Sequence, residues 1–252
     1  MISAMQSRWP TKRILIENTD LDAAYHQIHA HANTASTCIA IVDELDFLCF
    51  RLPFGTTPTP AEYTTISESA IDLGKNLLQD QSWDINDLNS PHMSLLPPEE
   101  KQQSASHLSK ADPLAVDITD TEASMDGFID DIITITANDD HWIDHAKIAA
   151  LLVIHTLFRP LQPSEPLKRD DPLSLRKLAG EGQLAKQNTC LGWDINTQYL
   201  RVSLPEEKQT AWTSDIKEAL ASTKIKTYTL ESLIGILNHA AHVILPERYF
   251  LN

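Results

Sequence analysis

A pair of adjacent aspartates constrains the fold of this chain more than any other feature. Asp130 and Asp131 lie inside the segment FIDDIITIT (128–136), where strand-forming residues stand on both sides of them. Such flanks favour a tight hairpin turn that carries both carboxylates. Aspartate is also a common turn former, so the pair alone is equally compatible with a purely structural turn.

A second acidic motif favours a functional role for the aspartate pair over a purely structural turn. Asp20 ends the apolar segment ILIENTD (14–20), and a strand-end aspartate can meet a hairpin aspartate across one sheet. Magnesium prefers oxygen ligands, usually one or two carboxylates together with substrate phosphates. Phosphoryl transfer depends mainly on such cations held in register. We therefore predict that Asp20 lies beside Asp130 on one sheet, and a large separation between them would exclude this interpretation.

The remaining pattern predicts an α+β fold, an antiparallel sheet backed by helices and followed by a small helical tail. Apolar spacing and turn residues place the other elements. We expect hairpins at 38–52 and 190–205 (the latter turning near Asn196-Thr197), a loop at 52–60, and helices at 61–78, 141–158, 173–180, 206–222 and 229–244. Residues 80–124 are polar and acidic and are predicted to form a surface insertion.

Composition excludes several classes of protein. The 252 residues contain no apolar run of membrane-spanning length, and the first residues do not resemble a signal peptide. The three cysteines are scattered, which argues against a disulfide framework or a zinc site. His26, His29 and His31 lie close in sequence but lack a recognised ligand spacing. We expect an intracellular protein that is not secreted and does not contact a membrane.

The charge of the chain bears on nucleic-acid binding. The formal net charge is −15, and phosphate contacts normally come from lysine and arginine. Acidic residues are concentrated in 80–140, whereas basic residues collect in 159–226. Any contact with nucleic acid is therefore expected to use the second stretch.

Five motifs together resemble one known family. They are TDLDAAYHQI (19–28), RLPFGTTPTPAEY (51–63), FIDD (128–131), CLGWDI (190–195) and the tail that begins LPEEKQTAW (204–212). In this order they resemble the palm and thumb of reverse transcriptases from gypsy/DIRS-like retroelements, over about residues 14–252. The resemblance implies RNA-directed DNA polymerase chemistry, in which two metal ions, Mg²⁺ or Mn²⁺, promote nucleotidyl transfer to a primer 3′-hydroxyl.

The resemblance also implies roles for particular residues. The catalytic, metal-binding carboxylates would be Asp20, Asp130 and Asp131. The nucleotide-binding residues would be Leu21 (through its backbone), Tyr25, Pro53, Phe54 and Gly55. The primer grip would be Leu191, Gly192 and Trp193. For Tyr25 and Trp193, plain core packing is the alternative.

The resemblance implies a division of the chain as well. Residues 1–160 would form the palm-like domain with its acidic insertion at about 80–124, and residues 161–252 the grip hairpin and helical thumb. The family's fingers region is expected to be missing, which is typical of a fragment of a retroelement polyprotein. The partners would be an RNA or DNA template-primer and a deoxynucleotide. Two alternatives stay open: an inactive remnant that keeps the palm fold, and an unrelated acidic α+β domain.

Overall fold

The structure, a computed structural model, divides into two compact units. It describes residues 1–35, 37–55, 59–80, 82–87, 90–98, 122–137, 140–166 and 169–244. The first unit comprises Met1–Leu191 and Asn196–Arg201, and the second comprises Gly192–Ile195 and Val202–Asn252. Residues 161–191 therefore fall in the first unit, whereas the resemblance implied that they belong with the grip hairpin and helical thumb.

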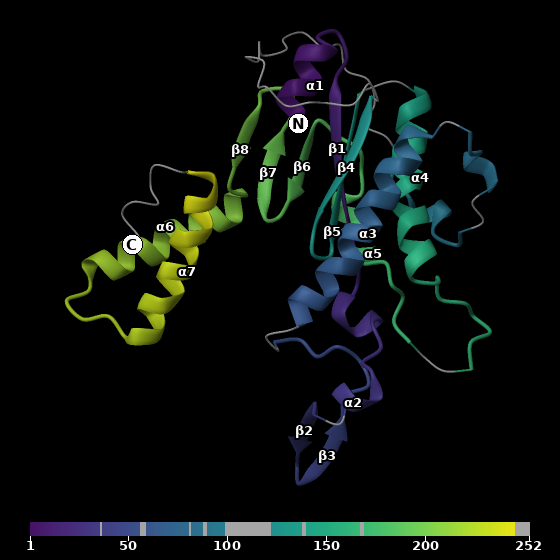
Figure 1. The fold of residues 1–252 in the computed structure, drawn as a ribbon. Coiled ribbons are helices and arrows are strands. Elements are labelled where there is room, and N and C mark those ends of the chain that lie inside the picture. Colours follow the sequence, from purple (N-terminus) through teal and green to yellow (C-terminus); the bar gives the residue numbers. More distant parts are fainter. Residues whose placement is uncertain are drawn as a thin grey trace. The chain divides into compact units, whose positions relative to one another are not determined.

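An antiparallel sheet with strand order β1-β5-β4 is the centre of the first unit (Figure 1). Strand β1 is Ile14–Asp20, β4 is Ala123–Phe128 and β5 is Asp131–Ala137. Pairing runs from Ile14 opposite Ala137 to Asp20 opposite Asp131. Because side chains alternate between the two faces of a strand, Asn18 and Asp20 share one face and Glu17 lies on the other.

Two long helices pack against the sheet and against each other. Helix α3 (Thr59–Gln79) contacts β4, helix α4 (Asp140–Leu157) contacts β5, and the two helices contact each other (Figure 1). Ala146, Ala149 and Ala150 of α4 are fully buried in the common core, and their small side chains permit close packing. The predicted helices at 61–78 and 141–158 and the α+β fold class are confirmed.

The segment predicted as an acidic surface insertion is only partly so. Within 80–124, the short helices η2 (Ile85–Asp87) and η3 (Met93–Leu95) belong to an ordered stretch beside α4. Trp83 meets the ring of His145 edge-on, and His92 is buried with its Nδ1 3.0 Å from His155 Nε2. This polar stretch therefore contains residues, Trp83 and His92, whose side chains contact α4. Residues 99–121 lie outside the described residues.

A small hairpin extends from the first unit. Strands β2 (Ile39–Val42) and β3 (Leu45–Leu48) pair with each other, which confirms the hairpin predicted at 38–52. Its two turn residues have positive φ angles, 49° at Asp43 and 65° at Glu44, as two-residue hairpin turns require. All strand residues of this hairpin are exposed.

The chain then forms a three-stranded sheet, not the single predicted hairpin. Strands β6 (Gln187–Cys190), β7 (Trp193–Asn196) and β8 (Arg201–Ser203) pair in that order. The first turn falls at Leu191-Gly192, where both φ angles are positive, and the second covers 197–200. The sequence predicts only the second turn, because the first lacks an asparagine or aspartate signal.

The shorter helices complete the described chain. They are α1 (Ile2–Arg8), η1 (Ala24–Gln27), α2 (Ala32–Ala35), α5 (Leu175–Glu181), α6 (Glu206–Ala221) and α7 (Thr227–Val243). Helix α1 was not predicted, whereas α5, α6 and α7 match the predicted spans closely. Among the helices that the structure describes, none has the length and apolarity needed to cross a membrane.

Stacked aromatic rings beside the Gly192 turn join the strand and the two helices of the second unit. Trp193 stacks on His239 of α7 with ring centroids 5.2 Å apart, and Trp212 of α6 meets His239 edge-on. Lys208 Nζ lies 3.3 Å from the Gly192 carbonyl oxygen. Strand β7 is thereby tied to both helices of its own unit.

Replacing Gly192 by alanine is expected to destabilise the chain by roughly 1–2 kcal/mol, because φ is +77° there and side chains disfavour that conformation. Gly235→Ala is the matched control in the same unit. Gly235 lies inside α7 with nothing within 4 Å of an added Cβ. Alanine there should stabilise by about 1 kcal/mol. Urea unfolding followed by tryptophan fluorescence measures the free energy of unfolding of both variants. Equal changes in the two variants would contradict the role of the positive φ angle at Gly192.

Candidate active site

Three carboxylates converge at one end of the β1–β5 ladder. Asp20 and Asp131 are directly opposite each other on adjacent strands, and Asp130 lies in the turn directly before Asp131. One carboxylate oxygen from each of the three lies within 4.8 Å of the others. The predicted neighbourhood of Asp20 and Asp130 on one sheet is therefore confirmed. The backbone N–H of Leu21 donates to the Asp130 carbonyl oxygen at 3.1 Å and locks the strand end to the turn.

The turn between β4 and β5 differs from the prediction in one detail. Its two residues are Ile129 and Asp130, since Phe128 pairs with Asp131. Asp131 therefore begins β5 and does not lie in the turn. Ile129 has a φ of +57°, which is an outlier for a β-branched residue and costs on the order of 1–3 kcal/mol. The pair of Phe128 and Asp131 closes this turn, so that Asp130 lies directly beside the first residue of β5.

A lysine that the sequence motifs do not indicate completes the cluster. Lys177 of α5 places its Nζ 3.1 Å from Asp20 Oδ1 and 3.1 Å from Asp131 Oδ1. Asn18 Nδ2 donates to Asp131 Oδ1 at 3.0 Å and to Glu181 Oε2 at 2.9 Å. Asn18 was detectable, because it is two residues from Asp20 on one strand face. Lys177 is distant in sequence and gave no local signal.

Burial and mutual repulsion perturb the carboxylates. Burial raises the pKa of Asp20 to about 6, and the charges of Asp130 and Asp131 add to this effect while Lys177 opposes it. Burial, followed by the charge of Asp131, also raises the pKa of Asp130. Burial alone would lower the pKa of Lys177, but its ion pairs with Asp20 and Asp131 outweigh this, so that the pKa is raised. Clustered acids with raised pKa values in a partly dry site are typical of functional sites.

Aromatic residues from two of the five motifs contact one another, and one of them lies near the cluster. Tyr25 meets Tyr63 edge-on with centroids 5.1 Å apart, and it meets Phe54 at 5.9 Å. Tyr63 is fully buried, and after burial itself the charges of Asp130 and Asp20 are the largest causes that raise the pKa of its phenol. Phe54 is 82% exposed, and Gly55 follows it with a φ of +88°. The structure thus brings Tyr25 of the first motif into contact with Phe54 and Tyr63 of the second, and Tyr63 is the ring near the carboxylates. Pro53 directly precedes Phe54 in the loop.

The residues predicted as a primer grip have different environments. Leu191 is 40% exposed at the turn, whereas Trp193 is only 7% exposed and stacks on His239. The Trp193 ring therefore serves packing within the second unit. Contact of this segment with a primer stays a prediction.

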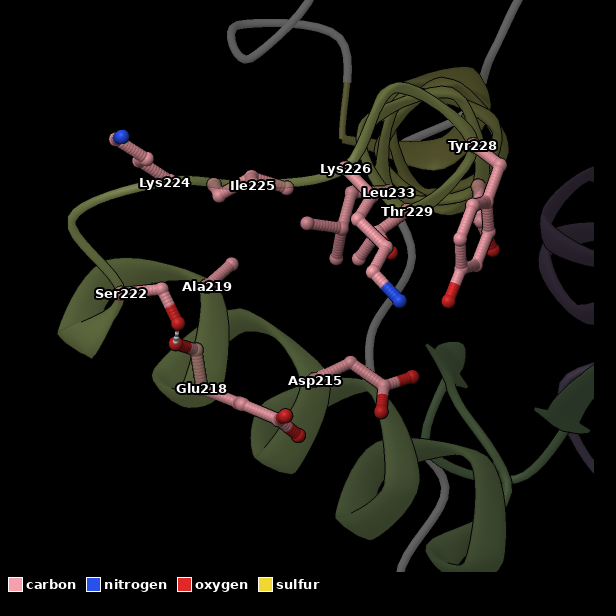
Figure 2. A pocket seen from close by; sticks show the side chains of 11 residues that line it. Asp215, Glu218, Ala219, Ser222, Lys224, Ile225, Lys226, Tyr228, Thr229 and Leu233 are labelled. Atoms are coloured by element: carbon pink, nitrogen blue, oxygen red, sulfur yellow. Dashed lines mark hydrogen bonds between the residues drawn. The ribbon is translucent and has the colours of Figure 1, made fainter.

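A pocket of about 490 Å³ lies between α6 and α7 within the second unit. Asp215 and Glu218 line it from α6, and Lys226 and Tyr228 from the start of α7 (Figure 2). The pocket combines charges of both signs and contains none of the residues singled out from the sequence. We place the candidate active site at the carboxylates, because they alone combine convergent ligand atoms with perturbed acids among the described residues.

The chain was compared with known proteins. No protein-family profile matches it. No curated protein matches it either. Among solved structures it is similar to a foamy viral protease-reverse transcriptase (the dRH form) in complex with double-stranded DNA, with a TM-score of 0.53 and 13% identity over 94% of this chain. It is also similar to a foamy viral protease-reverse transcriptase in complex with an RNA/DNA hybrid, with a TM-score of 0.52 and 15% identity over 94% of this chain.

These similarities define the fold. The chain has a reverse transcriptase-like fold, with antiparallel sheets backed by helices, and its described residues include the acidic triad of Asp20, Asp130 and Asp131. It spans 31% and 24% of the lengths of the two foamy viral chains.

Proposed function

We propose that this chain is the palm and thumb part of a reverse transcriptase of a gypsy/DIRS-like retroelement, and that it transfers nucleotides to a primer 3′-hydroxyl. The observation that carries the proposal is the convergence of Asp20, Asp130 and Asp131 at the end of one β-ladder. The motif order and the reverse transcriptase-like fold support it. The proposal includes a location inside the cell and an origin in a longer polyprotein.

The donor atoms of the cluster suit a hard divalent cation. All three side chains offer carboxylate oxygens, the ligands that Mg²⁺ and Mn²⁺ accept. A lysine ammonium already bridges two of these carboxylates, so the position favours positive charge. Asp20, Asp130 and Asp131 would hold the metal, with the Leu21 backbone as a further ligand by resemblance. When bound, such ions activate the attacking oxygen and stabilise charge on the transferred phosphoryl group.

The aromatic residues would act on the nucleotide. Tyr25 meets the ring of Tyr63 edge-on and the ring of Phe54 at a tilt, and these contacts orient its own ring. By resemblance, the Tyr25 ring would crowd the sugar 2′ position and favour deoxynucleotides. The exposed Phe54 and the adjacent Pro53 and Gly55 would line the nucleotide and template pocket.

We propose an RNA or DNA template-primer as the partner. The two similar structures hold double-stranded DNA and an RNA/DNA hybrid, and this supports the proposal for a chain of the same fold. Leu191, Gly192 and the backbone at Trp193 would contact the primer end.

The second candidate is an inactive remnant that keeps the fold. A net charge of −15 favours it, because a nucleic-acid polymerase must attract a polyanion. Primer extension on an oligo(dT)-primed poly(rA) template, with Mg²⁺ or Mn²⁺, decides between the candidates.

In that assay we expect extension by the chain and its loss, by a factor of about 1,000 or more, in an Asp130→Ala, Asp131→Ala variant. Circular dichroism must first show that both proteins are folded. Equal extension by the two proteins would point to a contaminant, and no extension by a folded chain would favour the remnant.

A further inference from the structure

One side chain already places a positive charge where the proposed function needs a metal ion. Lys177 Nζ is 3.1 Å from Asp20 Oδ1 and 3.1 Å from Asp131 Oδ1. We propose that Lys177 is an internal counter-ion that a divalent cation displaces, so that this lysine sets the affinity of the acidic cluster for metal. The inference rests on the proposed function, since it concerns the same carboxylates, but it is tested by binding and not by polymerisation.

The ammonium and a metal ion cannot share these oxygens. Magnesium sits about 2.0–2.1 Å from its carboxylate oxygens, so an ion held by Asp20 and Asp131 would occupy the space beside Lys177 Nζ. Positive charges at such short range repel strongly in a partly buried site. Binding of the ion therefore requires that the lysine side chain move away.

The position of Lys177 allows its ammonium group to move away from the two carboxylates. Its side chain is 30% exposed, whereas those of Asp20 and Asp131 are 9% and 13% exposed, so the ammonium lies on the solvent side of the carboxylates. A lysine binds as a point charge on a flexible stem and lacks the fixed fork with which arginine clamps a carboxylate. The ammonium can exchange one set of partners for water without any backbone movement.

The lysine also explains how the cluster forms without metal. Three carboxylates within 4.8 Å of one another repel when they are ionised. Lys177 and the Asn18 amide compensate Asp20 and Asp131. In the described part of the chain no cationic side chain pairs with Asp130, so one carboxylate stays available to an incoming ion.

The first test is a Mn²⁺ titration followed by electron paramagnetic resonance, on the full chain and on two variants. Lys177→Met removes the ammonium and keeps the length of the side chain. Arg176→Met removes one positive charge from the neighbouring, exposed position of α5 and controls for long-range charge. We expect Lys177→Met to bind Mn²⁺ about tenfold more tightly than the wild-type chain, and Arg176→Met to stay within about twofold of it. The gain should disappear when Asp131→Asn is added to Lys177→Met.

A second measurement uses the unaltered chain and does not depend on the folding of a variant. An amine-reactive reagent modifies lysines that are free of ion pairs faster than lysines that are held in them. Mn²⁺ should therefore raise the modification rate of Lys177, measured by mass spectrometry, and leave that of the exposed Lys217 unchanged.

The outcomes separate this inference from the proposed function. Equal or weaker Mn²⁺ binding by Lys177→Met, binding undetectable in both proteins, or a Lys177 modification rate that Mn²⁺ does not change would each overturn displacement. Tighter binding by Lys177→Met in a chain that extends no primer would establish the displacement and reject the polymerase. Primer extension by a chain in which Lys177→Met leaves Mn²⁺ binding unchanged would support the polymerase and reject the displacement of Lys177.

Discussion

Replacing Asp20 by asparagine is expected to abolish primer extension, by about 1,000-fold or more, and at the same time to stabilise the folded chain by about 1–2 kcal/mol. The loss of activity follows from the removal of one of three convergent carboxylates. The gain in stability follows from the cost of ionising a buried carboxyl group beside two others.

The sign of the stability change depends on pH. The pKa of Asp20 is raised from 3.8 to about 6 in the folded chain. Below pH 3.8 the carboxyl group is protonated in both states, so its ionisation contributes nothing. As the pH rises from 3.8 to 6, the unfolded chain loses its proton first and the wild-type chain loses stability. The advantage of Asp20→Asn should therefore appear in this window and persist above it. Solvent near the cluster reduces the advantage below the full value of the shift.

Urea unfolding at pH 4 and pH 7.5, together with primer extension, tests both parts. Asp22→Asn is the matched control, because Asp22 is exposed and lies two residues away in the same motif. That variant should change neither property. An Asp20→Asn protein that is less stable than wild type at pH 7.5 would show that the ion pair with Lys177 outweighs the cost of burial.

Glu17→Gln is expected to stabilise the chain strongly in alkaline solution. Glu17 is 1% exposed on the helix-covered face of β1, and burial raises its pKa from 4.5 to about 8, against opposing effects of Thr134 and Lys147. A folded-state pKa above the unfolded value means that stability falls as the pH rises from 4.5 to 8. Glutamine has nearly the same shape and does not ionise, so it should remove this loss.

The difference between Glu17→Gln and wild type should be under about 1 kcal/mol at pH 5 and reach up to about 4 kcal/mol at pH 9. Urea unfolding over this pH range measures it, with Glu68→Gln on the exposed surface of α3 as the control. A constant difference at all pH values would show that Glu17 is ionised throughout and paired with Lys147.

The parts of the site that could be predicted from the sequence are those written in local patterns. Asp130 and Asp131 have strand-forming flanks, and Asp20 ends an apolar run, so their meeting on one sheet was foreseeable. The long helices α3 and α4 have strong apolar spacing and were predicted within two residues. These features depend on neighbours in the chain, which the sequence displays directly.

The parts that were missed depend on contacts between distant residues. Lys177 reaches Asp20 and Asp131 only because α5 packs against β1, and nothing in its own helix marks it. The stretch around His92 was judged by its polar composition, yet His92 is buried through His155 and through Asp171, whose Oδ2 lies 3.1 Å from His92 Nε2. Composition cannot distinguish a solvated histidine from one paired in the interior.

The exposed β2–β3 hairpin has a consequence for the behaviour of the chain in concentrated solution. Apolar side chains of Ile41, Val42, Leu45 and Phe47 are all more than half exposed, on a two-stranded ribbon whose strand residues are all exposed. Exposed apolar strands can pair with the same strands of another molecule. The net charge of −15 opposes such encounters by mutual repulsion, and dissolved salt screens that repulsion. Colloidal stability of this chain therefore rests on its acidity, and it is greatest at low ionic strength.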